Sequence, residues 1–166
     1  YCRALSMQYG VDFFIVVPAT IYGPESLFDP ETNHVLTALI KKISDAKGNN
    51  EKEIMIFGTG KPLREFIYVD DLATACIFLM GYSETSGDIF NVGSGEEITI
   101  QDLALKIKDI VGFDGELNFD ISKPDGAMRK LLDSSKIKNL GWHPMISLDQ
   151  GIKLTVNYYN KLYLGK

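Results

Sequence analysis

Short apolar runs alternate along this chain with segments in which apolar residues recur every three or four positions. The runs DFFIVV (residues 12–17), IMIF (54–57) and DIFNV (88–92) predict strands, and segments 34–45 and 100–111 have helical spacing. This alternation is typical of α/β proteins, in which helices pack on a sheet. Because the strands are few and short, we expect a compact mixed layout with little of a parallel sheet.

The residues at the ends of these segments predict where elements start and stop. Gly10 would end a helix over residues 1–9, and Asn33, Thr99 and Ser147 would cap helices starting at 34, 100 and 148. Either Asp70 or Asp71 would cap a helix that continues to residue 80. The other expected elements are a strand over 12–17 buried on both faces, a loop over ATIYGPES (19–26), strands over 66–69 and 116–121, a short helix ended by Gly141, and a helix over 100–111 with Leu103, Leu105, Ile107 and Ile110 facing inward.

Composition excludes several classes of protein. With 166 residues, a net charge of −5 and a pI near 5.0, the chain does not resemble a nucleic-acid binder. Since no apolar run approaches the roughly 18 residues that span a bilayer, we expect no membrane segment. Two cysteines, Cys2 and Cys76, are too few for a disulfide framework or a thiolate metal site, which indicates a cytoplasmic protein. The first ten residues predict only the last turns of a helix, so we expect the C-terminal part of a longer protein.

Four polar residues are candidates for acid–base chemistry. His34 and His143 are the two histidines, and neither has a second ligand at metal spacing, so we expect no metal site. On the first turn of a helix, His34 is either a general acid or base or a surface histidine. Asp70 and Asp71 are either a catalytic carboxylate pair or the acidic start of a helix.

Basic residues and glycine turns are candidate phosphate-binding elements. Gly93-Ser-Gly95 follows a predicted strand, but Ile98 stands where a dinucleotide fingerprint needs its third glycine, so we expect a plain turn. Arg64, Arg129 and Lys130 lie near strand ends or in a turn-rich segment. They either converge on a diphosphate or are ordinary exposed cations.

Six segments resemble one known family. VVPATIYGP, NHVLTALIKK, IFGTGKPLREFIYVDDLA, FNVGSGEEITIQDLA, FDISKPDGAMRKLLD and LGWHPMISLDQGI are similar to the extended short-chain dehydrogenases/reductases of the NAD-dependent epimerase/dehydratase superfamily. The resemblance implies the C-terminal substrate-binding lobe of such a protein. Residues 1–24 would be a remnant of the NADP-binding Rossmann domain, and residues 25–166 would form mostly the substrate-binding lobe.

The segments NHVLTALIKK and SKPDGAMRKLLD are more particular to the GDP-L-fucose synthase group, which implies a GDP-sugar substrate and NADP. That group converts GDP-4-keto-6-deoxymannose to GDP-L-fucose by 3,5-epimerisation and NADPH-dependent 4-reduction. By position, the resemblance implies catalysis by His34, diphosphate binding by Arg64 and Lys130, further substrate contacts by Lys42 and Phe57, and contact with the nicotinamide by Pro18, Ala19, Thr20 and Ile21. The departures from the group's pattern are Pro-Ala-Thr-Ile in place of Pro-Thr-Asn-Leu, lysine at 42 and phenylalanine at 57.

The resemblance also implies parts that this sequence does not contain. The family's glycine-rich cofactor loop is missing, and no tyrosine here is followed by lysine four residues later, as in the family's Tyr-x-x-x-Lys pair. We therefore expect the chain alone to be inactive, and the full-length protein to be a homodimer. Two alternatives stay open: another nucleotide-sugar epimerase or dehydratase that uses NAD, and a stand-alone module that binds sugar nucleotides.

Overall fold

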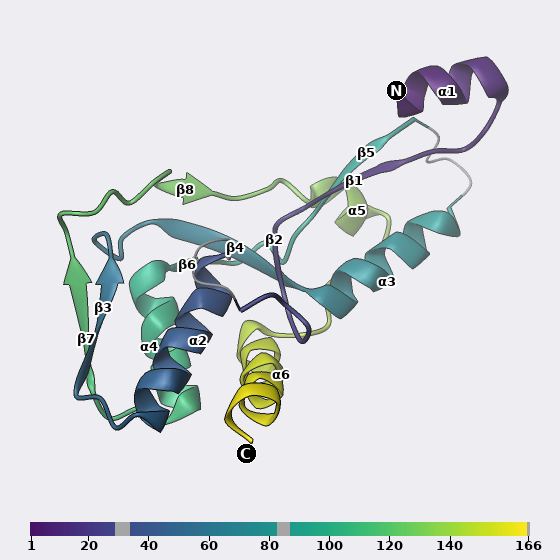
Figure 1. Ribbon diagram of the computed structural model, residues 1–166. Coiled ribbons are helices and arrows are strands. Elements are labelled where there is room, and N and C mark those ends of the chain that lie inside the picture. The colour runs from purple at the N-terminus through teal and green to yellow at the C-terminus, as the bar shows by residue number, and fades with distance from the viewer. Residues whose placement is uncertain (29–33, 83–86, 166) are drawn as a thin grey trace.

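The computed structural model describes residues 1–28, 34–82 and 87–165 and shows an α/β arrangement (Figure 1). The helices are α1 (Cys2–Tyr9), α2 (Val35–Gly48), α3 (Val69–Met80), α4 (Ile100–Val111), α5 (Ser135–Asn139) and α6 (Leu148–Tyr159), which a π-helical turn, η1 (Asn160–Leu164), extends. The strands are β1 (Ile15–Pro18), β2 (Thr20–Tyr22), β3 (Glu53–Phe57), β4 (Leu63–Tyr68), β5 (Ile89–Val92), β6 (Glu97–Thr99), β7 (Glu116–Asp120) and β8 (Arg129–Lys130).

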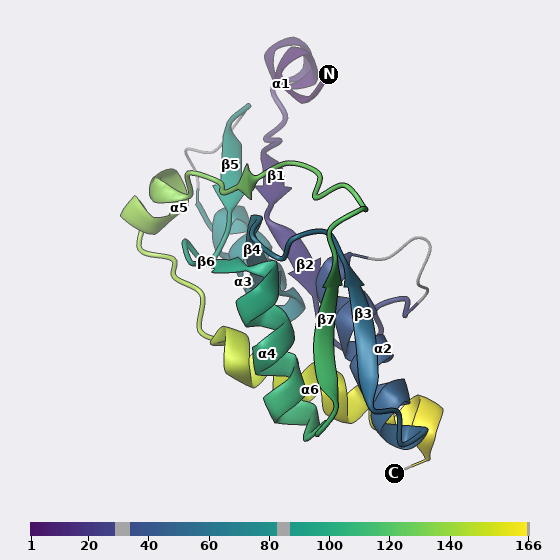
Figure 2. The same ribbon diagram turned by 90° about the vertical axis from the view of Figure 1, so that its left-hand side faces the viewer.

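Strand β4 is the centre of the sheet arrangement. It pairs with β2 in parallel, with β6 antiparallel and, at its first two residues, with β8 in parallel. Two further parallel pairs flank it: β1 with β5, and β3 with β7. Figure 2 shows β3 and β7 side by side in front of α2 and α4, with β1 and β5 near the N-terminal end. Among the described residues, the strands therefore form a four-stranded sheet around β4 and two separate two-stranded sheets.

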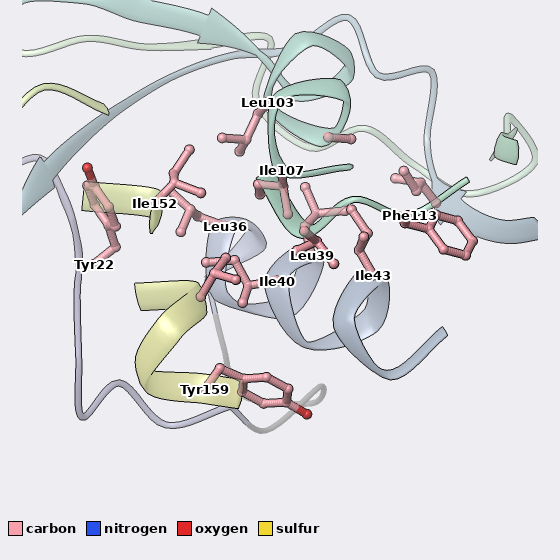
Figure 3. Packing of buried hydrophobic residues seen from close by; sticks show 14 of the residues in the cluster. Tyr22, Leu36, Leu39, Ile40, Ile43, Leu103, Ile107, Phe113, Ile152 and Tyr159 are labelled. Carbon is pink, nitrogen blue, oxygen red and sulfur yellow. The ribbon is translucent and has the colours of Figure 1, made fainter. Parts of the chain in front are cut away.

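The larger core lies where α2, α4 and α6 meet the β3–β7 pair. Leu36, Ile40 and Ile43 of α2 point toward Ile107 of α4 and Ile152 of α6, and all five are fully buried (Figure 3). At about 25 cal/mol for each Å² of apolar surface removed from water, side chains of this kind dominate the stability of the fold. This core fixes the start of α2, which carries His34.

A second core lies on the opposite face of β4, because Ile67 belongs to it whereas Phe66 and Tyr68 belong to the first. Phe90 and Val92 of β5 pack with Leu79 of α3 and Ile137 of α5, and Trp142 closes the cluster. Ala19, between β1 and β2, belongs to this second core, whereas Tyr22 belongs to the first. The segment of residues 18–22 therefore connects the two cores.

The structure corrects two expectations for the first strands. The apolar run 12–17 is not a strand buried on both faces: β1 begins only at Ile15, and Phe13 and Val17 are 40% and 38% exposed. The expected loop over 19–26 contains β2, because Thr20–Tyr22 pair in register with Phe66–Tyr68. That pairing partner lies far away in sequence, so the local pattern could not indicate it.

Helix boundaries agree with the sequence where the cap is local. Gly10 is left-handed with φ 63°, and the hydroxyls of Thr99 and Ser147 accept N–H groups of Asp102 and Gln150. Asn33 lies outside the described residues. The expected cap at Asp70 or Asp71 is wrong, since Tyr68 is the N-cap and both aspartates lie in the first turn of α3. The expectation that Leu105 faces inward is also wrong, because this residue is 44% exposed.

Candidate functional site

One cavity of about 560 Å³ brings together residues from four separate parts of the chain. Its lining comprises Pro18, Ala19, Thr20 and Ile21 where β1 ends and β2 begins, His34 at the start of α2, Glu65 of β4, and Lys130, Leu131 and Leu132 in and after β8. The structure thus places His34, Lys130 and the segment predicted to contact a nicotinamide around a single space.

Sheet pairing positions the wall formed by residues 18–21. Pro18 ends β1, the N–H of Ala19 donates to the carbonyl of Val92 at 2.9 Å, and Thr20 begins the pairing with β4. The chain crosses from one sheet to the other at this point. Pro18, Ala19 and Ile21 give the wall a mostly apolar character, which suits a flat ring better than a phosphate group.

The backbone of His34 is held by the start of α2. It is the N-cap residue in extended conformation, and its carbonyl accepts the hydroxyl of Thr37 at 3.0 Å and the N–H of Ala38 at 3.1 Å. The residue is exposed at the edge of the cavity. The imidazole is therefore placed where it can reach a bound molecule.

Arg64 and Lys130 lie next to each other on paired strands. Their Cα atoms are partners in the parallel pairing of β4 with β8. Lys130 lines the cavity, whereas Arg64 donates from Nη1 to the carbonyl of Leu63 at 2.8 Å. Arg129 is engaged elsewhere, because its guanidinium binds both carboxylate oxygens of Glu97 at 2.8 and 2.7 Å and lowers the pKa of that group.

Lys42 and Phe57 form a second cluster with a residue that the sequence did not single out. The ammonium groups of Lys42 and Lys123 lie 5.6 and 5.8 Å from the centroid of the Phe57 ring. Lys42 also donates to the carbonyl of Met55. The ring is 66% exposed, so one aromatic surface flanked by two cations faces solvent. Lys123 follows Ser122 in a turn sequence, and only its position beside the Phe57 ring in the folded structure indicates a role in this cluster.

The segment that carries Lys123 and Lys130 is tied to the Gly58–Gly60 turn. The carboxylate of Asp125 accepts the N–H and the hydroxyl of Thr59 at 2.6 and 2.7 Å, and these bonds lower its pKa. Gly58 has φ 86°, and a Cβ there would lie 2.3 Å from the Asp125 carboxylate. The glycine turn serves this contact and is not a dinucleotide fingerprint.

The other candidates are not grouped as a catalytic site. Asp71 is 3% exposed, and its carboxylate accepts the N–H groups of Met145 and Ile146 at 2.9 and 3.0 Å. It therefore orders a loop.

Within residues 1–28, 34–82 and 87–165, no group of three or more His, Cys, Asp or Glu side chains could hold a metal ion. In the same ranges no helix is both long and apolar enough to cross a bilayer.

The chain is similar to known proteins in sequence and in fold. GDP-L-fucose synthase 1 of Arabidopsis thaliana is 48% identical over 161 residues, which are 96% of this chain and 49% of that protein. The structure is similar to a GDP-6-OMe-4-keto-L-xylo-heptose reductase from C. jejuni, with a TM-score of 0.85, 33% identity, and 96% of this chain and 57% of that one covered. It also matches a GDP-L-fucose synthetase from Naegleria fowleri bound to NADP, with a TM-score of 0.82, 33% identity, and coverage of 90% of this chain and 47% of that one.

The chain spans about half the length of the curated relatives it matches. The sequence model of the NAD dependent epimerase/dehydratase family matches residues 1–93, a stretch that includes segment 18–21, His34 and Arg64. The chain is a homologue of GDP-L-fucose synthases and belongs to the NAD dependent epimerase/dehydratase family.

Proposed function

We propose that this chain is the C-terminal, sugar-nucleotide-binding part of a GDP-L-fucose synthase-like enzyme. The complete enzyme would convert GDP-4-keto-6-deoxymannose to GDP-L-fucose by 3,5-epimerisation and reduction at C4. The observation that carries the proposal is the common cavity of segment 18–21, His34 and Lys130. A keto sugar held by its diphosphate requires a general acid or base for the sugar, a cation for the diphosphate and an apolar wall, and these would be His34, Lys130 and segment 18–21.

The basic residues would bind the nucleotide. Lys130 at the cavity and Arg64 on the adjoining strand supply positive charge for a diphosphate. Phe57, with Lys42 beside its ring, offers an exposed aromatic surface on which the nucleobase can stack. Charge from separate elements is needed here because the chain as a whole is acidic.

His34 would move a proton at the sugar. Epimerisation beside a keto group removes a proton from one face and adds one to the other, so an imidazole, which can accept or donate a proton, is suited to one of these steps. The second group, which would handle the proton on the opposite face of the sugar, would come from the part of the enzyme outside this chain. His34 lies at the cavity edge, from which it can approach the sugar when the diphosphate is on Lys130.

The cofactor would be NADP, touched by this chain only at its nicotinamide end. Pro18, Ala19, Thr20 and Ile21 would hold the ring, and the cofactor supplies the hydride for reduction at C4. In this proposal residues 1–24 belong to the cofactor domain and residues 25–166 mostly to the substrate lobe. The active enzyme would be a cytoplasmic homodimer.

Calorimetric titration of the 166-residue chain with GDP tests the binding role. We expect binding, and Lys130→Ala or Arg64→Ala should each weaken it about tenfold, since each removes a charge-assisted contact of the diphosphate. His34→Gln should leave the affinity within about twofold, because the base and diphosphate do not contact the imidazole in this proposal. Failure of the wild-type chain to bind GDP would refute the proposal.

Turnover separates the enzyme from a stand-alone binding module, which the missing Tyr-x-x-x-Lys pair favours. The chain alone should not oxidise NADPH in the presence of the keto sugar nucleotide. When it is joined to the N-terminal half of the Arabidopsis relative, turnover should appear, and His34→Gln should lower it about 100-fold or more. If the joined protein binds GDP but turns over no nucleotide sugar, the result would support the alternative of a stand-alone module that binds sugar nucleotides. A preference for NAD and another sugar nucleotide in a substrate panel would support the other epimerases or dehydratases.

A further inference from the structure

Glu65 is a buried carboxylate for which the proposed reaction has no role. It is 2% exposed on β4, and each of its oxygens accepts one backbone N–H: Oε1 from Gly95 at 2.7 Å and Oε2 from Leu132 at 2.9 Å. Gly95 belongs to the turn after β5, and Leu132 follows β8 by two residues. The carboxylate therefore ties two segments, the turn at Gly95 and the chain at Leu132, to the central strand β4.

Glu97 holds the same segment from the other side of Lys130. It is the pairing partner of Glu65 in the antiparallel β4–β6 ladder, and it receives the bidentate contact of Arg129. Arg129 directly precedes Lys130, and Leu132 follows it by two positions. Two carboxylates on adjacent strands thus hold the chain immediately before and shortly after the lysine.

Besides these two carboxylates, the segment around Lys130 is held at Met128, whose carbonyl accepts the N–H of Leu63 at 2.9 Å, and at Asp133, whose carbonyl accepts Nδ2 of Asn91 at 3.0 Å. Strand β8 has two residues, pairs only with Leu63 and Arg64 in the described part of the chain, and is exposed throughout. Fixing a backbone residue in one conformation costs about 1–2 kcal/mol of conformational entropy, and a two-residue ladder offsets little of it. The side chain can stay at the cavity only if neighbouring contacts hold the strand.

Gly93 shows that the position of the Glu65 carboxylate is tightly constrained. A Cβ at residue 93 would lie 2.2 Å from Oε1 and 2.7 Å from the carboxyl carbon. The first glycine of the Gly-Ser-Gly turn is therefore required by the carboxylate beside it. Since Glu65 also lines the cavity with Lys130, the contact is part of the wall of the candidate site.

We propose that Glu65 and Glu97 are positioning residues that clamp the Lys130 segment against β4 and so hold its ammonium group at the nucleotide site. The role in binding rests on the proposed function, whereas the clamp itself is a property of the fold. The two parts require separate measurements.

The first measurement is hydrogen–deuterium exchange without any ligand. In Glu65→Gln the amide would turn an N–H group toward one of the two backbone donors, so one contact is lost with little change of volume. We expect about tenfold faster exchange in residues 127–132, and a smaller increase in Glu97→Gln. Glu96→Gln, an exposed neighbour in the same turn, is the matched control and should not change exchange there. Equal exchange in all four proteins would overturn the clamp, even if GDP binds.

The second measurement is GDP affinity in a double-mutant cycle with Lys130→Ala. Glu65→Gln and Glu97→Gln should each weaken binding about three- to tenfold in the wild-type background, as coupled neighbours do. In the Lys130→Ala background neither should change affinity by more than about twofold, because the group they position is gone. Equal losses in both backgrounds would show that the glutamates do not act through Lys130.

Circular dichroism must show that each variant is folded. If Glu65→Gln does not fold, Glu97→Gln decides the cycle, because that glutamate lies nearer the surface. If the wild-type chain binds no GDP but exchange rises as expected, the clamp stands and the proposed function fails.

Discussion

Asp70 and Asp71 are adjacent carboxylates in the first turn of α3 with different surroundings. Asp70 is exposed, whereas Asp71 is 3% exposed and accepts the N–H groups of Met145 and Ile146. Both gain the same favourable interaction with the helix N-terminus. The difference between them therefore isolates the value of the buried contacts.

Asp71→Asn should destabilise the protein by about 1.5–3 kcal/mol, because one buried N–H would face an amide NH₂ and lose its charged acceptor. Asp70→Asn should change stability by no more than about 0.5 kcal/mol. Urea unfolding followed by circular dichroism measures both. Equal effects would mean that helix-terminus electrostatics, not loop anchoring, accounts for Asp71.

At the scale of elements, two serines lie at helix N-caps in different states. Ser147 completes a capping box with Gln150 at the start of α6. Ser134 precedes α5 without a side-chain cap bond, and its Oγ is buried with no hydrogen-bond partner among the residues that the structure describes. A satisfied and an unsatisfied hydroxyl can thus be compared within one chain.

Ser147→Ala should lower the free energy of unfolding by about 1 kcal/mol, since α6 would lose its cap. Ser134→Ala removes a buried hydroxyl that has no partner and should be neutral or stabilising. Thermal and urea unfolding of the two variants give the comparison. A larger loss for Ser134→Ala than for Ser147→Ala would contradict this account.

At the largest scale, helices α1 and α3 lie toward the same end of the molecule as β1 and β5 (Figure 1), and both helices carry exposed apolar side chains. Met7 of α1 is 89% exposed, and Ile77 and Met80 of α3 are 69% and 76% exposed. In the described chain β1 pairs only with β5, which leaves its other edge open. Open strand edges and large apolar patches both promote association.

The chain should therefore self-associate as its concentration rises, and sedimentation velocity should show a growing species larger than a monomer. Replacing both Ile77 and Met80 with lysine should shift the distribution toward monomer. Leu162→Lys, which changes a 57% exposed side chain in η1, should not. A strictly monomeric wild-type chain would disprove the role of this surface.

Elements whose signals are local can be predicted from the amino-acid sequence alone. The left-handed Gly10 and the Thr99 and Ser147 caps act within three or four residues, so their side chains and φ angles specify the boundaries of α1, α4 and α6. Family resemblance, not spacing, identified His34, Lys130 and segment 18–21 as a group. Their meeting at one cavity followed from the fold.

Strands β2, β6 and β8 and the contacts of Glu65, Glu97 and Lys123 depend instead on residues that folding brings together from distant parts of the chain. Short strands form because a distant partner supplies hydrogen bonds and register: residues 20–22 pair with 66–68, and residues 63–64 pair with 129–130. A charged residue inside a strand, such as Glu65, likewise has a place only when folding brings backbone N–H groups to both oxygens. Local pattern cannot contain that information, because the donors lie 30 and 67 residues away along the chain.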